Sequence, residues 1–338
     1  MRFDRRWRFS GAARQGLAAL CVALAAGLTA LPDGHADEPA LSFVALGDQP
    51  YSLREQRSWP DLIEAINRAE PTFVVHVGDI KRGSAPCTGG WLLAVRALLS
   101  RIEAPVVYTP GDNEWTDCRR PEAGGFDPEE RLAALRQVFF SGFFAGDDER
   151  LGVERQSDDP SHRDYVENAR WSIEGVVFAT LHVVGSNNND REGDARAQNE
   201  FARRSAANRA WLAATLQRAE AEDARALVLF FHGDPFVRSR NGASGYREFL
   251  GALARAARAF KGPVLLVHGD SHEYWVDQPL IDPADGAALS NVTRVEVFGS
   301  PTVEAVEVRV RWADAQPFAI RPLGFAMQRL GRAKATGF

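Results

Sequence analysis

Five apolar runs along this chain each end in the dipeptide Gly-Asp, and this repeated ending limits the folds open to it. The runs are FVALGD at 43–48, TFVVHVGD at 72–79, APVVYTPGD at 104–112, ALVLFFHGD at 226–234 and PVLLVHGD at 263–270. Short runs rich in Val, Leu and Phe are typical of buried strands. The glycine lets the backbone turn, and the aspartate beyond it projects over the sheet edge where open α/β sheets bind ligands. With His232 and His268 in the last two runs and His272 just after them, the pattern predicts a metal site.

Segments with helical periodicity separate these runs and give a β-α-β-α order. We expect helices over 58–69, 91–102, 196–221 and 242–260. Another helix starts at Asp127, which is followed by Pro128 and Glu130 in the pattern of a capped N-terminus. We expect a β-hairpin over 171–184, antiparallel strands over 294–312, and an insertion or surface loop over the polar residues 141–170.

The composition is ordinary for a globular protein. A length of 338 residues, 45% of them hydrophobic, suits one large α/β domain or two small ones. The formal net charge is −5, and no run of Lys or Arg occurs, so the sequence indicates no nucleic-acid surface.

The first 36 residues have the pattern of a secretory signal peptide. Arginines at 2, 5, 6 and 8 precede an apolar stretch over 16–31, and Gly34 and Ala36 supply small residues for cleavage. The alternative is an uncleaved membrane anchor, for which about 16 apolar residues are short. We therefore expect a signal peptide over 1–36, one domain over 37–325 and a tail over 326–338. The mature protein is then periplasmic or secreted, with no stable membrane span.

Two cysteines remain once the signal is removed. Cys87 and Cys118 each follow a Gly-Asp ending, by eight and six residues. In an oxidising compartment we expect them to form a disulfide that ties two site loops together, the alternative being two unrelated thiols.

The motifs, taken in order, resemble those of the calcineurin-like metallophosphoesterase family. That family carries D-x-H, GD-x-x-D/N, GNH-D/E, a lone His and GH-x-H, which here correspond to Asp48, GD at 78–79, GDNE at 111–114, His232 and GDSH at 269–272. The resemblance covers roughly residues 41–280. It implies an α/β fold, a metallophosphoesterase-like α/β/β/α sandwich of two mixed sheets flanked by helices.

The resemblance also implies two divalent metal ions. Asp79 would bridge them, Asp48 and His272 would bind one, and Asp112, His232 and Asp270 the other. Carboxylates stand at 112 and 270 where the family has Asn and His, so the site is rich in oxygen. Oxygen ligands favour Mn²⁺, Mg²⁺ or Ca²⁺, while the two imidazoles still admit Fe or Zn.

Two departures from the family bear on catalysis. Pro50 stands where the family has the His of D-x-H, and Asn113 where it has its catalytic His. Asn113 therefore occupies a catalytic position without an ionisable proton. His268 is the other candidate proton source, and it is either a partner to a metal ligand or a strand-end residue.

Polar residues near the motifs are candidates for binding substrate. Asn187 and Asn188 lie in the run SNNN after a strand, where they either contact a phosphate or sugar or form an Asn-rich turn. Tyr51 is a further candidate, at the rim of the site. His76 and His182 lie inside strands, and we expect both in the core.

Two functions fit these residues. The first is an exported metal-dependent hydrolase in which a metal-activated water attacks a small phosphomonoester or phosphodiester. The second is a non-catalytic relative that binds phosphate, a nucleotide or a glycan. The carboxylates favour the hydrolase, and Pro50 and Asn113 favour the binding protein.

Overall fold

The computed structural model describes residues 41–236, 244–282 and 284–324, whose strands form two mixed sheets. The first sheet has the order β12-β11-β1-β2-β3. Its strands are β1 (Leu41–Leu46), β2 (Phe73–His76), β3 (Val106–Tyr108), β11 (Ala305–Val310) and β12 (Phe318–Leu323). The second sheet has the order β4-β5-β6-β7-β8-β10-β9. Its strands are β4 (Glu154–Arg155), β5 (Ala169–Ile173), β6 (Val176–Thr180), β7 (Ala226–Phe230), β8 (Val264–His268), β9 (Trp275–Asp277) and β10 (Val292–Glu296).

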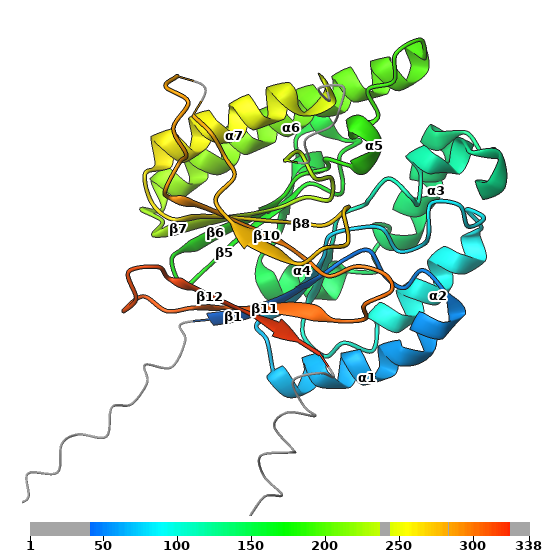
Figure 1. Ribbon diagram of the computed structural model, residues 1–338, viewed down its shortest axis with the longest axis horizontal. Helices are drawn as coiled ribbons and strands as arrows, with labels where there is room; N and C mark the ends of the chain where they lie inside the picture. Colours follow the sequence, from blue (N-terminus) through cyan, green and yellow to red (C-terminus); the bar gives the residue numbers. More distant parts are fainter. Residues whose placement is uncertain (1–40, 237–243, 283, 325–338) are drawn as a thin grey trace, which may run out of the picture. The chain divides into compact units, whose positions relative to one another are not determined.

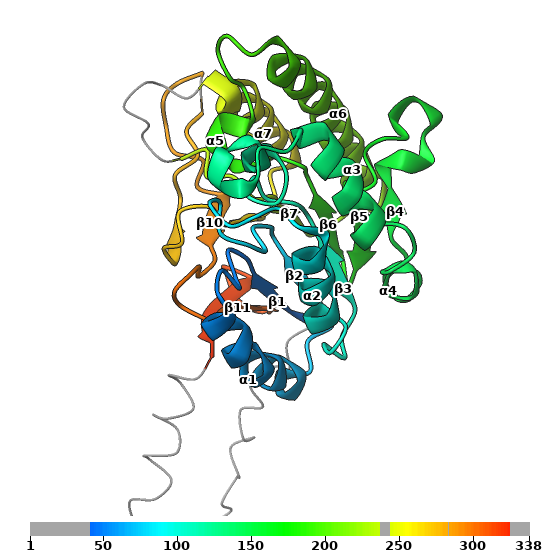
Figure 2. The ribbon, with the colours of Figure 1, turned by 90° about the vertical axis from the view of Figure 1, so that its right-hand side faces the viewer.

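Helices cover the outer face of each sheet, as Figure 1 shows. The first sheet packs against α1 (Leu53–Ala69), α2 (Gly89–Leu99) and α3 (Pro128–Phe139). The second packs against α6 (Ala195–Ala221) and α7 (Arg247–Phe260). The remaining helices are α4 (Ala145–Leu151) and α5 (Gly185–Asn188), with 3₁₀ turns at Thr116–Arg119, Pro121–Ala123, Gln156–Asp158, Pro160–His162 and Ser244–Tyr246. Figure 2 shows α1 and α2 on the side of β1, and α6 on the side of β6.

The main core lies between the two sheets. Phe43 and Phe73 from the first sheet stack with ring centroids 5.2 Å apart, and both meet Phe178 of the second sheet edge-on. Successive side chains of β1 alternate: Phe43 and Ala45 join this core, while Val44 and Leu46 face the helices. The sheets are therefore buried on both faces, and the predicted α/β/β/α sandwich is confirmed.

Parallel pairing brings the Gly-Asp endings to one edge. β1, β2 and β3 pair in parallel, as do β6, β7, β8 and β10. The five predicted runs are the strands β1, β2, β3, β7 and β8, and each Gly-Asp lies just beyond its strand. The sequence therefore placed all five endings correctly at carboxyl ends of parallel strands.

The predicted helices exist, with some shifted boundaries. Asp127 caps α3 as predicted, its Oδ1 accepting hydrogen bonds from the backbone N–H groups of Glu129 and Glu130. The helix expected over 58–69 begins five residues earlier, at Leu53, because Ser52 caps it through the N–H of Glu55. The helix expected over 242–260 begins at Arg247 after a 3₁₀ turn.

Two expectations are refined by the structure. Residues 294–312 contain strands with antiparallel partners, as expected, since β10 pairs with β9 and β11 with β1 and β12, but β10 also pairs in parallel with β8 and the two strands lie in different sheets. Residues 141–170 are not merely a surface loop, since they contain α4 and β4 and bury Glu167 and Asn168. The hairpin at 171–184 is confirmed as β5 and β6.

The predicted signal peptide over 1–36 and tail over 326–338 lie outside the described residues. Within the described part of the chain, none of the helices combines the length and apolar character that a membrane crossing needs.

Candidate metal centre

Four of the five Gly-Asp aspartates converge where the two sheets meet. Asp48 and Asp79 follow strands of the first sheet and Asp270 follows β8 of the second, yet the N–H of Asp270 donates to both carboxylate oxygens of Asp48, at 3.2 and 3.1 Å. Two groups have ligand atoms that all lie within 4.8 Å of one another: Asp48, Asp79 and His232, and Asp112, His232 and Asp270. The cluster therefore joins ligands from both sheets.

Strained backbone gathers at these positions. Asp48, Asp79, Asp270 and His272 all have positive φ, at 54°, 57°, 85° and 67°. Left-handed backbone is uncommon outside glycine and costs of order 1–3 kcal/mol per residue. The sheets on either side hold these residues in conformations that aim their side chains at a common centre.

Two of the glycines are required by close packing. A Cβ at Gly111 would lie 2.1 Å from Asp79 Oδ1, and a Cβ at Gly269 would lie 2.1 Å from Asp48 Oδ2. Each glycine thus makes room for the carboxylate that follows another strand, β2 for Gly111 and β1 of the other sheet for Gly269, which explains why the dipeptide recurs.

His232 lies at the middle of the carboxylates. Its Nε2 is 3.3 Å from Asp79 Oδ1, 3.2 Å from Asp112 Oδ1 and 3.7 Å from Asp270 Oδ1. Its Nδ1 lies 2.9 Å from the carbonyl oxygen of Val77, to which it can donate. A backbone partner on one ring nitrogen leaves the other facing the centre, which is the usual arrangement of a metal-binding His.

His272 has the same arrangement at the edge of the cluster. Its Nδ1 lies 3.0 Å from the carbonyl oxygen of Ser300, and its Nε2 lies 3.6 Å from Asp48 Oδ1. The two histidines therefore each present Nε2 to the carboxylates. The residues fit a centre for hard divalent cations that also accepts imidazole ligands.

Burial shapes the charges of the cluster. Burial raises the pKa of Asp48 to about 7 and that of Asp270 to about 6, and it also raises the pKa of Asp79. Burial alone would lower the pKa of His232, but the charge of Asp79 and the hydrogen bond with Asp112 hold it well above its usual value. Four carboxylates around one imidazole are a strongly negative site, which cations would stabilise.

Asn113 touches the cluster directly. Its backbone N–H donates to Asp79 Oδ1 at 2.9 Å, and its Nδ2 donates to Asp79 Oδ2 and, at 3.0 Å, to the Tyr51 hydroxyl. Tyr51, predicted at the rim, reaches further in than expected, because its hydroxyl donates to Asp79 Oδ2 at 2.8 Å.

The predicted substrate contacts Asn187 and Asn188 are used within the protein. Asn187 Oδ1 accepts from the N–H of Gly245, and its Nδ2 donates to the carbonyl of Asp190. Asn188 is buried and accepts from Arg204. The structure brings their neighbour Ser186 to the cluster instead: its Oγ donates to Asp112 Oδ2 at 2.7 Å.

His268, the other predicted proton source, lies away from the cluster. Its ring is fully buried and stacks on Phe231 with centroids 5.4 Å apart. Its Nε2 lies 4.0 Å from Asp234 Oδ1, and Asp234 belongs to neither group of candidate ligands. His76 and His182 are fully buried, as predicted.

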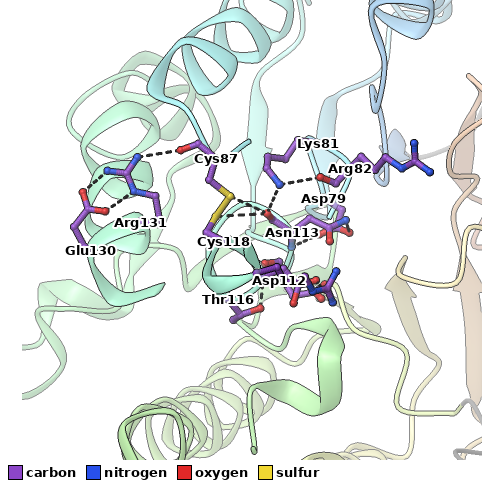
Figure 3. Close-up of a disulfide and its surroundings, with 12 residues drawn as sticks. Asp79, Lys81, Arg82, Cys87, Asp112, Asn113, Thr116, Cys118, Glu130 and Arg131 are labelled. Atoms are coloured by element: carbon purple, nitrogen blue, oxygen red, sulfur yellow. Dashed lines mark hydrogen bonds and ion pairs between the residues drawn. A yellow bond between two sulfur atoms is a disulfide. The ribbon is translucent and has the colours of Figure 1, made fainter. Parts of the chain in front are cut away.

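The disulfide between Cys87 and Cys118 joins two loops of the site, as predicted, with Cα atoms 5.6 Å apart (Figure 3). Beside it, buried Lys81 donates from Nζ to the carbonyls of Arg82 and Asn113, at 2.8 and 2.7 Å. The bridge and the lysine together fix the loop after β2 to the loop after β3.

Two acidic residues of these loops have structural roles that the sequence did not specify. Glu114 is buried, and its Oε1 accepts from the N–H groups of Asp79 and Gly111. Asp117 pairs with Arg120 at 2.6 Å, and its carboxylate also accepts from Ser186. Glu114 ends the GDNE motif, but nothing in the sequence separates Asp117 from an ordinary loop residue.

A cavity of about 700 Å³ opens over the cluster. Its lining includes Asp79, Asn113 and His272 together with the arginines Arg82 and Arg120. Arg82 is exposed. The cavity thus combines candidate metal ligands with two cationic side chains suited to an anion.

Comparisons agree with this architecture. The model of the calcineurin-like phosphoesterase family matches residues 41–274. A dimetal phosphatase from Danio rerio is similar, with a TM-score of 0.53, 14% identity, and coverage of 85% of this chain and 97% of that chain. A purple acid phosphatase from yellow lupin (Lupinus luteus) seeds has a TM-score of 0.46 and 13% identity over 85% of this chain and 55% of that chain. No curated protein matches the sequence.

Proposed function

Because this chain belongs to the calcineurin-like phosphoesterase family, we propose that it is a metal-dependent hydrolase of a small phosphomonoester or phosphodiester. The observation that carries the proposal is the convergence of Asp48, Asp79, Asp112 and Asp270 on the Nε2 face of His232. Cations can neutralise the charge of such a buried cluster in place of protons, and the family uses such a cluster for two metal ions.

The candidate ligands are those that the geometry brings together. Asp48 and Asp79, with His272 beside them, would hold one ion, and Asp112 and Asp270 the other; His232 is close to both sets. When bound, two divalent ions supply charge neutralisation for a phosphate and a water activated for in-line attack. A bridging role for Asp79 is part of this proposal.

Other side chains of the cavity act on the substrate itself. Asn113 can donate a hydrogen bond to an ester oxygen, but an amide releases no proton near neutral pH. Arg82 and Arg120 line the same cavity, and their guanidinium groups can pair with phosphate oxygens. These residues support binding and orientation of an anionic ester next to the cluster.

The second function, a protein that binds phosphate, a nucleotide or a glycan without turnover, has its own support. Pro50 removes one imidazole that the family uses for metal, and Asn113 replaces the family's catalytic His. A binding protein needs the cavity and the cations, but it does not need a proton donor.

We also propose that the protein works outside the cytoplasm, in the periplasm or after secretion. The N-terminal pattern of a signal peptide supports this. So does the Cys87–Cys118 disulfide, since such bridges persist mainly in oxidising compartments.

One purified sample tests the proposal through two measurements, metal content by plasma emission and turnover of nitrophenyl phosphate esters. We expect up to two ions per chain and metal-dependent hydrolysis, both lost in Asp79→Asn. Asp234→Asn is the matched control, because Asp234 ends a Gly-Asp run but belongs to neither candidate ligand group. Bound metal without turnover of any ester would favour the binding protein, and the absence of metal would contradict both functions.

A further inference from the structure

Tyr51 lies where the cluster is short of a ligand. Besides His232, which is close to both sides, the candidate donors around Asp48 are Asp48, Asp79 and His272, whereas Asp112 and Asp270 lie on the other side. The family's additional imidazole on the Asp48 side is absent, because position 50 is proline. The proline side chain has no donor atom to offer a cation, so this half of the centre has room for another side-chain ligand.

The phenol oxygen of Tyr51 reaches that half of the cluster. It is 2.8 Å from Asp79 Oδ2, 3.2 Å from His272 Nε2 and 3.4 Å from Asp48 Oδ1. These three atoms belong to the three candidate ligands of the Asp48 side. An oxygen that touches all of them at once occupies the space next to any ion that they bind.

Neighbouring groups hold Tyr51 in this position from two sides. Its backbone N–H donates to Glu55 Oε2 at 2.6 Å, and Glu55 in turn accepts from Ser300 Oγ at 2.9 Å. Its ring meets the ring of His272 edge-on, with centroids 5.1 Å apart. The side chain is therefore fixed before any ion arrives, which lowers the entropic cost of using it as a ligand.

We propose that Tyr51 is a protein ligand of the metal ion on the Asp48 side, its phenol oxygen replacing the imidazole that Pro50 removes. This inference rests on the proposed metal centre. It gives the Asp48 side four protein donors, three of them oxygens, the same numbers that the other side has when Asp79 bridges the two ions. Hard cations such as Mn²⁺ and Mg²⁺ suit this donor set.

The alternative role for Tyr51 is to position Asp79 and Asn113 through hydrogen bonds. Asn113 Nδ2 donates to the Tyr51 hydroxyl at 3.0 Å and also to Asp79. If Tyr51 acted only through this network, then Asn113→Ala would weaken metal binding as much as removal of the phenol oxygen does. Direct ligation predicts a larger effect at Tyr51.

Titration of the metal-free chain with Mn²⁺ tests the inference. We expect Tyr51→Phe to weaken the affinity of one of the two Mn²⁺ binding events at least tenfold and to leave the other within about twofold. We expect Asn113→Ala to weaken the affected binding event by less than Tyr51→Phe does. Tyr165→Phe is the matched control, since Tyr165 lines a different cavity together with His162. Equal effects of Tyr51→Phe and Asn113→Ala, or none for Tyr51→Phe, would overturn the inference.

Anomalous diffraction from wild-type crystals grown with Mn²⁺ gives an independent readout that needs no variant. We expect an ion with the Tyr51 oxygen at a distance of about 2.0–2.6 Å, the range of oxygen ligands to Mg²⁺ and Ca²⁺. An ion bound to Asp48 with the phenol oxygen beyond about 3 Å would overturn Tyr51 as a ligand and leave the proposed function standing. If wild-type protein binds no ion, the proposed function fails together with this inference.

Discussion

Asn113 is the residue whose chemistry most limits the proposed reaction. Its side chain lies against Asp79 and Tyr51 and lines the cavity, so it is well placed to contact a bound ester. An amide can donate a hydrogen bond to a departing oxygen but cannot transfer a proton to it. The identity of the leaving group should therefore decide the rate.

We predict that wild-type protein hydrolyses nitrophenyl esters much faster than alkyl esters. Proton transfer from a positioned side chain is worth about 10²–10⁴-fold in rate, and this help matters most for a poor leaving group. Asn113→His should raise the alkyl rate and flatten the dependence on leaving-group pKa, measured over a series of substituted phenyl and alkyl phosphates. Metal content must be unchanged in the variant. Equal wild-type rates on both ester types would show that another group supplies the proton.

At the residue scale, the sequence predicts the candidate ligands better than their supports. The structure brings Asp48, Asp79, Asp112, His232 and Asp270 together, and a Gly-Asp ending or a His beside it marks each of them in the sequence. Ser186 was passed over in favour of Asn187 and Asn188. The choice depends on the left-handed turn of this segment, where Ser186 Oγ contacts Asp112, and no sequence pattern shows which side chain such a turn directs inward.

The left-handed turn at 186–189 is the strained element of the site. Its four residues all have positive φ, between 51° and 63°. Buried Arg204 holds it by donating to the carbonyl oxygen of Asn188 at 2.9 Å and to its side-chain Oδ1 at 2.6 Å. Arg204 also pairs with buried Glu200 at 2.7 Å. The turn therefore depends on one cation from α6.

We predict that Arg204→Met lowers the free energy of unfolding by about 3–5 kcal/mol, because it leaves Glu200 buried without its partner. Arg203→Met is the matched control: Arg203 is the preceding residue of α6 and pairs with Glu129 at the surface, where such pairs are worth about 1 kcal/mol or less. Urea denaturation measures both. Similar losses in the two variants would contradict the assigned role of Arg204.

The disulfide acts at the same scale by joining the loops after β2 and β3. Cys87 and Cys118 are 31 residues apart, and closing a loop of this length is worth about 3–4 kcal/mol in the chain-entropy model. We predict that Cys87→Ser with Cys118→Ser lowers stability by this amount and raises KM, since Arg82 and Arg120 lie on the two joined loops. The oxidised wild type should show no titratable thiol from this pair. Unchanged melting temperature after reduction would contradict the prediction.

The elements that the sequence predicted poorly are those fixed by distant partners. Residues 292–296 and 305–310 both look like strands, but the first pairs with β8 and the second with β1. The alternation of side chains defines the two faces of a strand, but it does not determine which strand pairs with it. The Gly-Asp runs were easier to place, because a shared site at one sheet edge requires these strands to run parallel to one another.

For the whole molecule, the two sheets bring together charges that neither would bury alone. Asp48 and Asp79 come from one sheet and His232 and Asp270 from the other. The metal-free protein holds protons there, since burial raises the pKa of Asp48 to about 7 and that of Asp270 to about 6. A bound cation must displace these protons, so metal binding and pH are linked.

We predict that the stabilisation produced by metal grows as pH rises through about 6 to about 7, by up to about 1.4 kcal/mol per pH unit for each proton released. A raised carboxyl pKa means that the metal-free fold keeps its proton below that pKa. For each pH unit below that pKa, the affinity of the protein for the ion falls by up to tenfold. The measurement is the free energy of unfolding with saturating Mn²⁺ minus that with a chelator, at several pH values.

The difference between the two free energies of unfolding isolates the effect of the metal, because other buried groups change protonation in the same pH range. Burial lowers the pKa of His76 to about 4 and that of His268 to about 3. Because of both histidines, the free energy of unfolding rises as pH increases towards 6.5, with or without metal. Their contribution cancels in the difference, whereas that of Asp48 and Asp270 does not. With [Mn²⁺] held fixed at 100 times the dissociation constant measured at about pH 7.5, the gap should reach about 2.7 kcal/mol per site at that pH and be smaller at lower pH. A gap that stays constant between about pH 5.5 and about pH 7.5 would mean that no proton leaves when the ion binds, and the buried aspartates would then not be its ligands.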